Sequence, residues 1–182
     1  LFEWNKFSGY DRFEGGVRAN LGAQYTGTFG GGAAVNIMAG QSFQLAGKNS
    51  YAAANAANVG INTGLQTKRS DYVGRIAMEP APGYSLIAKA RFDQNNFALR
   101  RLDVGANFML TSRLSGQVMY SRYTAQPEIG FPFRREGVLT AASFNINKNY
   151  WVSASTLLQL DRHQWDKVLN TRTRLVYPAQ IG

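Results

Sequence analysis

Apolar and polar residues alternate with a period of two along much of the chain. Residues 17–25 place Val17, Leu21 and Tyr25 on one side and Arg18 and Gln24 on the other. Residues 84–93 and 101–110 repeat this pattern, and over the three segments one side is apolar at 15 of 15 positions and the other at 2 of 14. Because successive side chains of a strand point to opposite faces, these segments are predicted to be strands with one apolar face.

Weaker alternation predicts further strands within 35–43, 72–78, 114–120, 138–146 and 150–160, and 171–177 could begin a ninth. No stretch shows a sustained 3.6-residue period, so almost no helix is expected. The connections alternate in size: 30–32, 80–83, 111–113 and 148–149 are short, whereas 46–70, 94–100 and 124–135 are longer. The sequence therefore predicts an all-β antiparallel meander of about eight or nine strands, with tight turns at one end and long loops at the other.

The alternation alone fits a soluble barrel or sandwich with the apolar face inside and a transmembrane barrel with that face in lipid. Three features favour the membrane. Aromatic residues lie at both ends of the apolar face, the strands have the ~9–11 residues that cross a bilayer when tilted, and the polar face is poor in Lys and Glu. We therefore expect part of an outer-membrane β-barrel wall. The residues expected to face lipid include Leu21, Tyr25, Leu86, Ala88, Phe92, Val104 and Phe108.

Composition removes most enzyme chemistry. The 182 residues include no Cys and one His, which excludes thiol nucleophiles and Cys- or His-rich metal sites, and no cofactor is expected. His163 follows Asp161 closely, as in a catalytic triad, but the stretch is typical of a charged loop and no nucleophile is placed beside it. We predict no catalytic residues and no enzymatic activity.

The net charge is +9, and several of the basic residues are predicted to lie together on the polar face. There, three consecutive strands carry a basic stripe, with Glu79, Asp93 and Asp103 as the expected counter-charges. The stripe consists of Arg75, Lys89, Arg91 and Arg101. It could guide anionic groups, or it could be balanced by those carboxylates or by a partner inside the barrel. Nucleic acid is not an expected partner, because the aromatic residues occupy the opposite face.

Several ordered blocks resemble the LptD family of lipopolysaccharide (LPS) assembly proteins of Gram-negative bacteria, also called OstA or Imp. They are residues 7–12, 14–22, 40–47 and 69–73, and the similarity covers most of residues 7–123. The resemblance implies part of a large outer-membrane barrel that inserts LPS into the outer leaflet. It also implies an LptE-like plug lipoprotein, periplasmic LPS bridge proteins and membrane lipid as partners.

The sequence departs from the family pattern in lacking the cysteines that form disulfides there. We therefore expect residues 1–182 to be a partial barrel domain, an excised segment without the N-terminal periplasmic domain and the closing strands. The segment would be a structural wall of the LPS-export translocon. A segment of a generic porin or other outer-membrane channel is the alternative.

Overall fold

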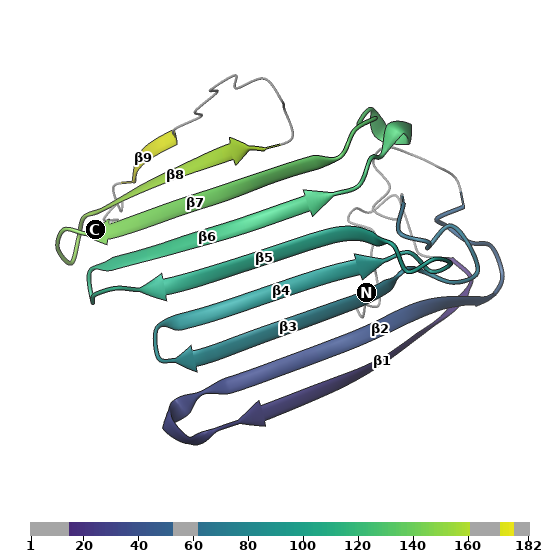
Figure 1. The fold of residues 1–182 in the computed structure, drawn as a ribbon, viewed down its shortest axis with the longest axis horizontal. Helices are drawn as coiled ribbons and strands as arrows, with labels where there is room; N and C mark the ends of the chain where they lie inside the picture. Colours follow the sequence, from purple (N-terminus) through teal and green to yellow (C-terminus); the bar gives the residue numbers. More distant parts are fainter. Residues whose placement is uncertain (1–14, 53–61, 161–171, 177–182) are drawn as a thin grey trace, which may run out of the picture.

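The computed structural model describes residues 15–52, 62–160 and 172–176. They form one antiparallel sheet in which the strands follow their order in the chain (Figure 1). The strands are β1 (Val17–Thr28), β2 (Ala34–Ala46), β3 (Tyr72–Ala81), β4 (Tyr84–Phe92), β5 (Leu99–Met109), β6 (Leu114–Tyr123), β7 (Arg135–Asn145), β8 (Trp151–Gln159) and β9 (Arg172–Val176). The sheet is an open meander, which confirms the predicted fold class, including the ninth strand.

Helical structure in the described part of the chain is confined to two 3₁₀ turns, η1 (Gly30–Gly32) and η2 (Pro127–Ile129). None of the described residues forms a helix of the length and apolar character that a bilayer crossing requires. Strands β1–β8 have 9 to 13 residues, longer than the ~5–6 typical of globular proteins. Their length matches the expectation from the alternating pattern.

The connections sort by length to opposite ends of the sheet (Figure 1). At one end lie η1 and residues 82–83, 110–113 and 146–150; at the other lie the described residues 47–52 and 62–71, with residues 93–98 and 124–134. Gly83 has a φ of +84°, a conformation that costs glycine little and other residues more, and it closes the two-residue turn between β3 and β4. We call the end of the sheet with the short connections the turn end, and the end with the longer connections the loop end.

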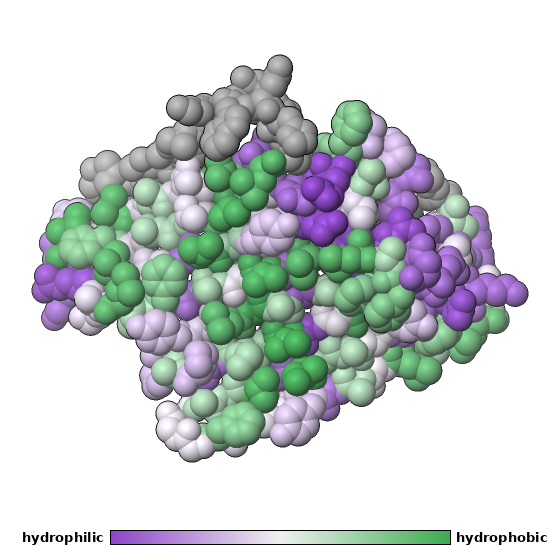
Figure 2. Space-filling view, in the orientation of Figure 1, coloured by the Kyte–Doolittle hydropathy of each residue, from purple (hydrophilic) through white to green (hydrophobic). Residues whose placement is uncertain are grey.

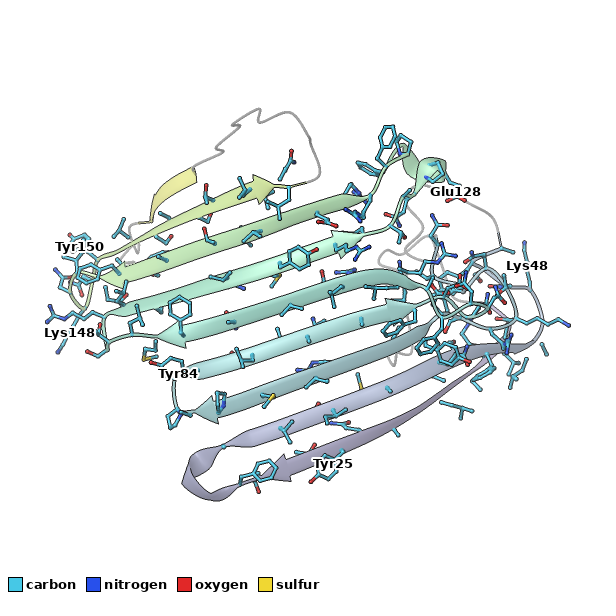
Figure 3. All side chains as sticks on the ribbon, viewed as in Figure 1. Tyr25, Lys48, Tyr84, Glu128, Lys148 and Tyr150 are labelled. Atoms are coloured by element: carbon cyan, nitrogen blue, oxygen red, sulfur yellow. The ribbon has the colours of Figure 1, made fainter. Side chains whose placement is uncertain are left out.

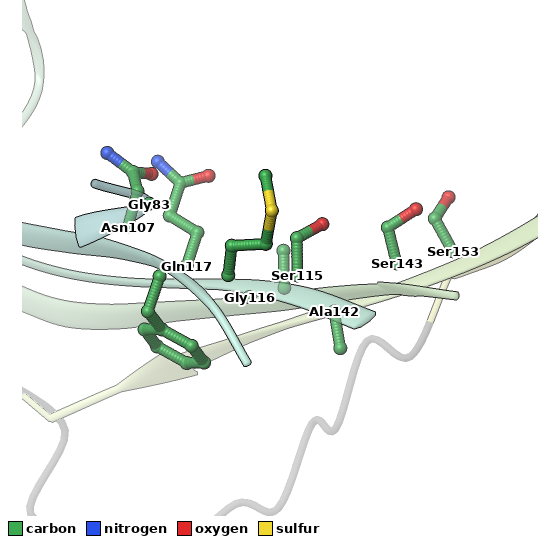
Figure 4. Close-up of a pocket in the computed structure, with 11 residues that line it drawn as sticks. Gly83, Asn107, Ser115, Gly116, Gln117, Ala142, Ser143 and Ser153 are labelled. Carbon is green, nitrogen blue, oxygen red and sulfur yellow. The ribbon is translucent and has the colours of Figure 1, made fainter. Parts of the chain in front are cut away.

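The two faces of the sheet differ in chemistry. In Figure 4, Asn107, Gln117, Ser115, Ser143 and Ser153 point to one side of the sheet, and Ala142 points to the other. The polar side chains belong to strands β5–β8 and line a hollow of about 380 Å³ near the turn end. The opposite face is largely apolar: in Figure 2 hydrophobic residues predominate across the middle of the sheet, and hydrophilic residues gather toward the loop end.

The apolar face is exposed rather than packed. Leu21 is 62% exposed, and Tyr25 and Tyr84 project from the same surface (Figure 3). Among the described residues, Tyr51 and Leu65 are the only hydrophobic side chains that are buried, and both belong to the β2–β3 loop. An apolar surface of this extent marks a contact with lipid or with another protein.

The β2–β3 loop folds against the polar face of β1 and β2. Arg18, on β1, donates to Ser42 Oγ at 3.4 Å and to Asn49 Oδ1 at 3.1 Å, and its guanidinium lies 5.0 Å from the centre of the Tyr51 ring. A second contact runs from the Asn62 side-chain amide to Glu128 Oε2, at 2.5 Å. Because Glu128 lies in η2, this hydrogen bond joins the β2–β3 loop to the β6–β7 loop, and strands β4 and β5 lie between the two hairpins.

Candidate functional site

Strand register brings the four predicted basic residues together on the polar face. Arg75 on β3 is directly opposite Lys89 on β4, and Arg91 on β4 is opposite Arg101 on β5. Side chains opposite each other in an antiparallel pair lie about 4.5–5.5 Å apart at Cβ. All four line one hollow of about 360 Å³, together with Asp103 and Met38.

The row through Arg91 and Arg101 continues onto β6 and β7, beyond the three strands of the predicted basic stripe. Arg101 is opposite Tyr123 on β6, which in turn is opposite Arg135 on β7. Both guanidinium groups approach the Tyr123 ring, at 4.7 Å from Arg101 and 5.3 Å from Arg135. The Arg135 guanidinium also lies 3.7 Å from the centre of the Phe131 ring. We call Arg91, Arg101, Tyr123 and Arg135 the loop-end row; cation–π contacts hold two of its charges in place.

The counter-charges differ in part from the expectation. Arg101 Nε contacts Asp103 Oδ2 at 2.5 Å, as expected, but Arg91 is paired with Asp71, at 3.5 Å. Asp71 lies just before β3 and is buried. Burial raises the pKa of its carboxyl above the ordinary value, while the charge of Arg91 opposes that rise.

The assignment of Asp93 as a counter-charge to the stripe is wrong. Its carboxylate accepts hydrogen bonds from Arg100 and from the backbone N–H groups of Asn95 and Asn96. These bonds, that of Arg100 first, lower the pKa of Asp93 to about 2. Asp93 therefore stabilises the β4–β5 loop. Glu79 forms no ion pair with any residue that the structure describes.

Two cations of the stripe have no carboxylate partner among the described residues. Arg75 Nη1 donates to Asn36 Oδ1 at 3.4 Å, and no acidic oxygen of these residues lies within 4.0 Å of Arg75 or Lys89. The nearest candidate, Asp103 opposite Lys89, is taken by Arg101. The hollow thus carries positive charge that the described wall leaves unbalanced.

The residues expected to face lipid lie together on the opposite face. Register places Leu86 beside Ala106, Ala88 beside Val104, and Phe92 beside Tyr72. The remaining members follow the same alternation: Leu21 and Tyr25 on β1, and Phe108 on β5 beside Tyr84. Register thus places these residues on one face of the sheet, some exposed and others half-buried; lipid as the neighbour of that face belongs to the proposal below.

One charged cluster interrupts the apolar face near the loop end. Arg122 and Glu136 are opposite each other on β6 and β7, at positions of the apolar face, with Arg122 Nε 3.5 Å from Glu136 Oε1. Arg134 contacts the same carboxylate oxygen at 2.8 Å. Sequence alternation missed this cluster because each charge alone looks like an ordinary strand end. The cluster can be recognised only when β6 and β7 are aligned, because Arg122 and Glu136 then lie opposite each other.

Other candidate chemistry finds little support. Asp161 and His163 lie outside the described residues. Within the described ranges, no group of three or more His, Cys, Asp or Glu residues is arranged to hold a metal ion.

A single meander, with one polar and one apolar exposed face, tight turns at one end and long loops at the other, is the architecture of an outer-membrane β-barrel wall. The family model for LptD, LPS transport system D, matches residues 1–151. The chain belongs to the LptD family. No curated protein and no solved structure matches it.

Membership of this family gives the chain its function and its place in the cell. The family resides in the outer membrane of Gram-negative bacteria, where it inserts LPS into the outer leaflet. It is a transport barrel, not an enzyme. The match decides between the two functions that the sequence left open, in favour of LPS transport over a generic porin wall.

Proposed function

We propose that the basic hollow guides the phosphate groups and acidic sugars of LPS along the inner face of the barrel wall, while the apolar face contacts membrane lipid. The observation that carries this proposal is the pair Arg75 and Lys89, whose charges no described carboxylate balances. Unbalanced cations in a confined hollow attract anions more strongly than the same charges on an open surface.

The loop-end row gives the hollow a direction. Arg75 and Lys89 lie near the middle of their strands, and Arg91, Arg101 and Arg135 lie nearer the loop end. In outer-membrane barrels the long loops face outward. An anionic group that leaves Lys89 therefore meets further guanidinium groups towards the outer leaflet.

The proposal extends to partners and to the rest of the barrel. An LptE-like plug lipoprotein on the polar face and periplasmic LPS bridge proteins at the turn end would complete the path. Support comes from family membership and from the open edges of the sheet: β1 and β9 each pair with a strand on one side only, among the described residues. We propose residues 1–182 as one part of a larger barrel domain.

A photoreactive amino acid tests the path. The photoreactive residue is placed at Lys89 of the barrel, expressed in cells, where it should form adducts with LPS. Placed instead at Ser153, on the same face but remote from the hollow, it should form few. Charge reversal by Arg75→Glu should lower the adduct yield at position 89 several-fold, whereas Gln117→Glu should not. Equal yields at positions 89 and 153, or no effect of Arg75→Glu, would refute guidance by this hollow.

A further inference from the structure

A second hollow, of about 460 Å³, opens on the apolar face near the loop end of strands β1–β4. Small residues on β1, β2 and β3 form part of its lining, and aromatic rings stand around them. The small residues are Gly22, Ala39, Gly40 and Gly74, and the aromatic residues are Phe43, Tyr72, Phe92 and Phe97. The side-chain amide of Gln41, which also lines the hollow, is already engaged, because it donates to the Ser70 carbonyl at 2.8 Å. The site therefore suits an apolar ligand.

Phe97 is held over this hollow at a conformational cost. Its φ of +58° is unfavourable for a bulky side chain. The β4–β5 loop fixes it: Phe97 N–H donates to the Asp93 carbonyl at 3.1 Å, and Asp93 N–H donates to the Ala98 carbonyl at 2.8 Å. The Phe97 ring stacks on Phe92 with centroids 4.7 Å apart, and it lies 5.4 Å from Tyr72. It nevertheless remains 61% exposed. Such strain is typical of functional positions.

The surroundings of Gly74 show that no other side chain fills the hollow at this position. A Cβ atom built on Gly74 would meet only the Met38 carbonyl oxygen, at 3.9 Å. The φ of Gly74 does not require glycine. A larger side chain would fit here without strain, and its absence leaves room for a ligand.

A cation stands at the rim. Arg69 forms an isolated antiparallel bridge with Phe43, which lines the hollow. Bridge partners project from the same face of a sheet, so Arg69 leaves the wall on the apolar side. It is exposed, and no carboxylate of the described residues is within ion-pair distance of it. A guanidinium at this place matches a phosphate group at the level of the lipid headgroups.

We propose that this hollow seats one acyl chain of an LPS molecule of the outer leaflet, with Arg69 facing its phosphate. The inference rests on the proposed contact of the apolar face with lipid. The loop end faces the outer leaflet in barrels of this class, so the lipid beside it is LPS. The site would hold a resident lipid on the outer surface of the wall, separate from the transport path on the polar face.

Native mass spectrometry of the detergent-folded barrel with added LPS tests the seat. Gly74→Leu fills the hollow and should weaken LPS binding about tenfold, the loss expected when a leucine displaces some two methylene groups. Ala39→Leu, from the neighbouring strand, should act alike if Gly74→Leu folds poorly. Arg69→Gln should weaken binding of LPS but not of a neutral lipid. Ala154→Leu, on the same face but on β8, is the matched control and should change nothing.

A lipid-soluble quencher acting on a label at Ala88→Cys, which is on the apolar face but outside this hollow, separates the two proposals. If the quencher reaches the label while Gly74→Leu and Ala39→Leu leave LPS binding unchanged, the seat is refuted and the lipid contact stands. If the label is protected from the quencher, the lipid contact of the apolar face is refuted, and the LPS seat with it. Binding of a zwitterionic phospholipid as tight as that of LPS, and lost in Gly74→Leu, would overturn the assignment to LPS.

Discussion

The Phe108 ring covers Gly116 on the neighbouring strand. The two residues are directly opposite each other on β5 and β6, and a Cβ atom at Gly116 would come within 2.6 Å of Phe108 Cζ. An aromatic ring that lies over a glycine shields backbone that would otherwise lack a side chain. This contact lies near the turn end, where the predicted aromatic belt of the apolar face is found.

This relationship predicts a change of sign between two backgrounds. Gly116→Ala should lower the free energy of unfolding by about 1 kcal/mol, because the new methyl group displaces the Phe108 ring. In a Phe108→Ala background the same change should be neutral or stabilising, since alanine is better than glycine in a strand. Urea unfolding of the lipid-folded barrel measures both. Equal effects in the two backgrounds would contradict the contact.

The lipid assignment predicts opposite responses from two strand positions. Arg at Ala88, near mid-strand on the apolar face, should cost about 2–4 kcal/mol in a membrane-folded barrel. Arg at Asn107, on the polar face, should cost far less, because the charge stays hydrated and only the hydrogen bond to Ser85 Oγ, at 3.1 Å, is lost. Folding free energies in lipid give the comparison.

A soluble barrel would also penalise Ala88→Arg, so a labelling experiment must accompany it. The chain has no Cys, so a single introduced Cys carries a unique label. A lipid-soluble quencher should reach a label at Ala88 and not one at Lys89. The reverse result would mean that the apolar face points inward.

The β4–β5 loop should respond to acid through Asp93. Its pKa of about 2 lies below the ordinary value of 3.8. The stabilisation by its ionised form is therefore complete above about pH 4 and is lost as the pH falls through 2. Hydrogen exchange at the amides of Asn95 and Asn96 should accelerate over that window beyond the intrinsic pH effect. Asp93→Asn should abolish the transition; a transition that persists in this variant would assign it to another group.

The charged pair on the apolar face should behave as a pair. Arg122 and Glu136 side chains are 35% and 18% exposed, so removing one partner leaves the other poorly hydrated. Glu136→Leu alone should destabilise the lipid-folded barrel, whereas Arg122→Leu with Glu136→Leu should be as stable as the wild type or more so. Unfolding titrations of both variants decide. A double variant less stable than the single one would show that the charges act separately.

The period-two pattern predicted the meander, the two faces and the turn and loop ends, because each depends only on alternation and on connection length. Alternation also predicts that the four basic residues share one face, and register places them there; they are Arg75, Lys89, Arg91 and Arg101. The ion-pair partners of these arginines were harder to predict. Asp71 lies in a loop beside β3, and Asp93 turns back to Arg100, so neither pairing follows from parity.

Register was the missing information. Tyr123 and Arg135 join the row of Arg101 only when β5, β6 and β7 are aligned residue by residue, and the lengths of the intervening loops do not fix that alignment. The burial of Tyr51 and Leu65 against the polar face likewise depends on how the β2–β3 loop folds back, which alternation does not describe. The hollow beside Gly74 could not be predicted either, because its shape depends on the backbone conformation of Phe97.

The hydrogen bond between Asn62 and Glu128 has a mechanical consequence. It ties together the β2–β3 and β6–β7 hairpins, which have β4 and β5 between them, so it acts as a brace across the wall at the loop end. Bending the sheet about β4 and β5 would stretch this brace, and the tight turns at the opposite end, each linking adjacent strands, provide no equivalent among the described residues. We therefore expect this hydrogen bond to resist bending of the sheet at the loop end, and flexing of the barrel segment to be concentrated at the turn end.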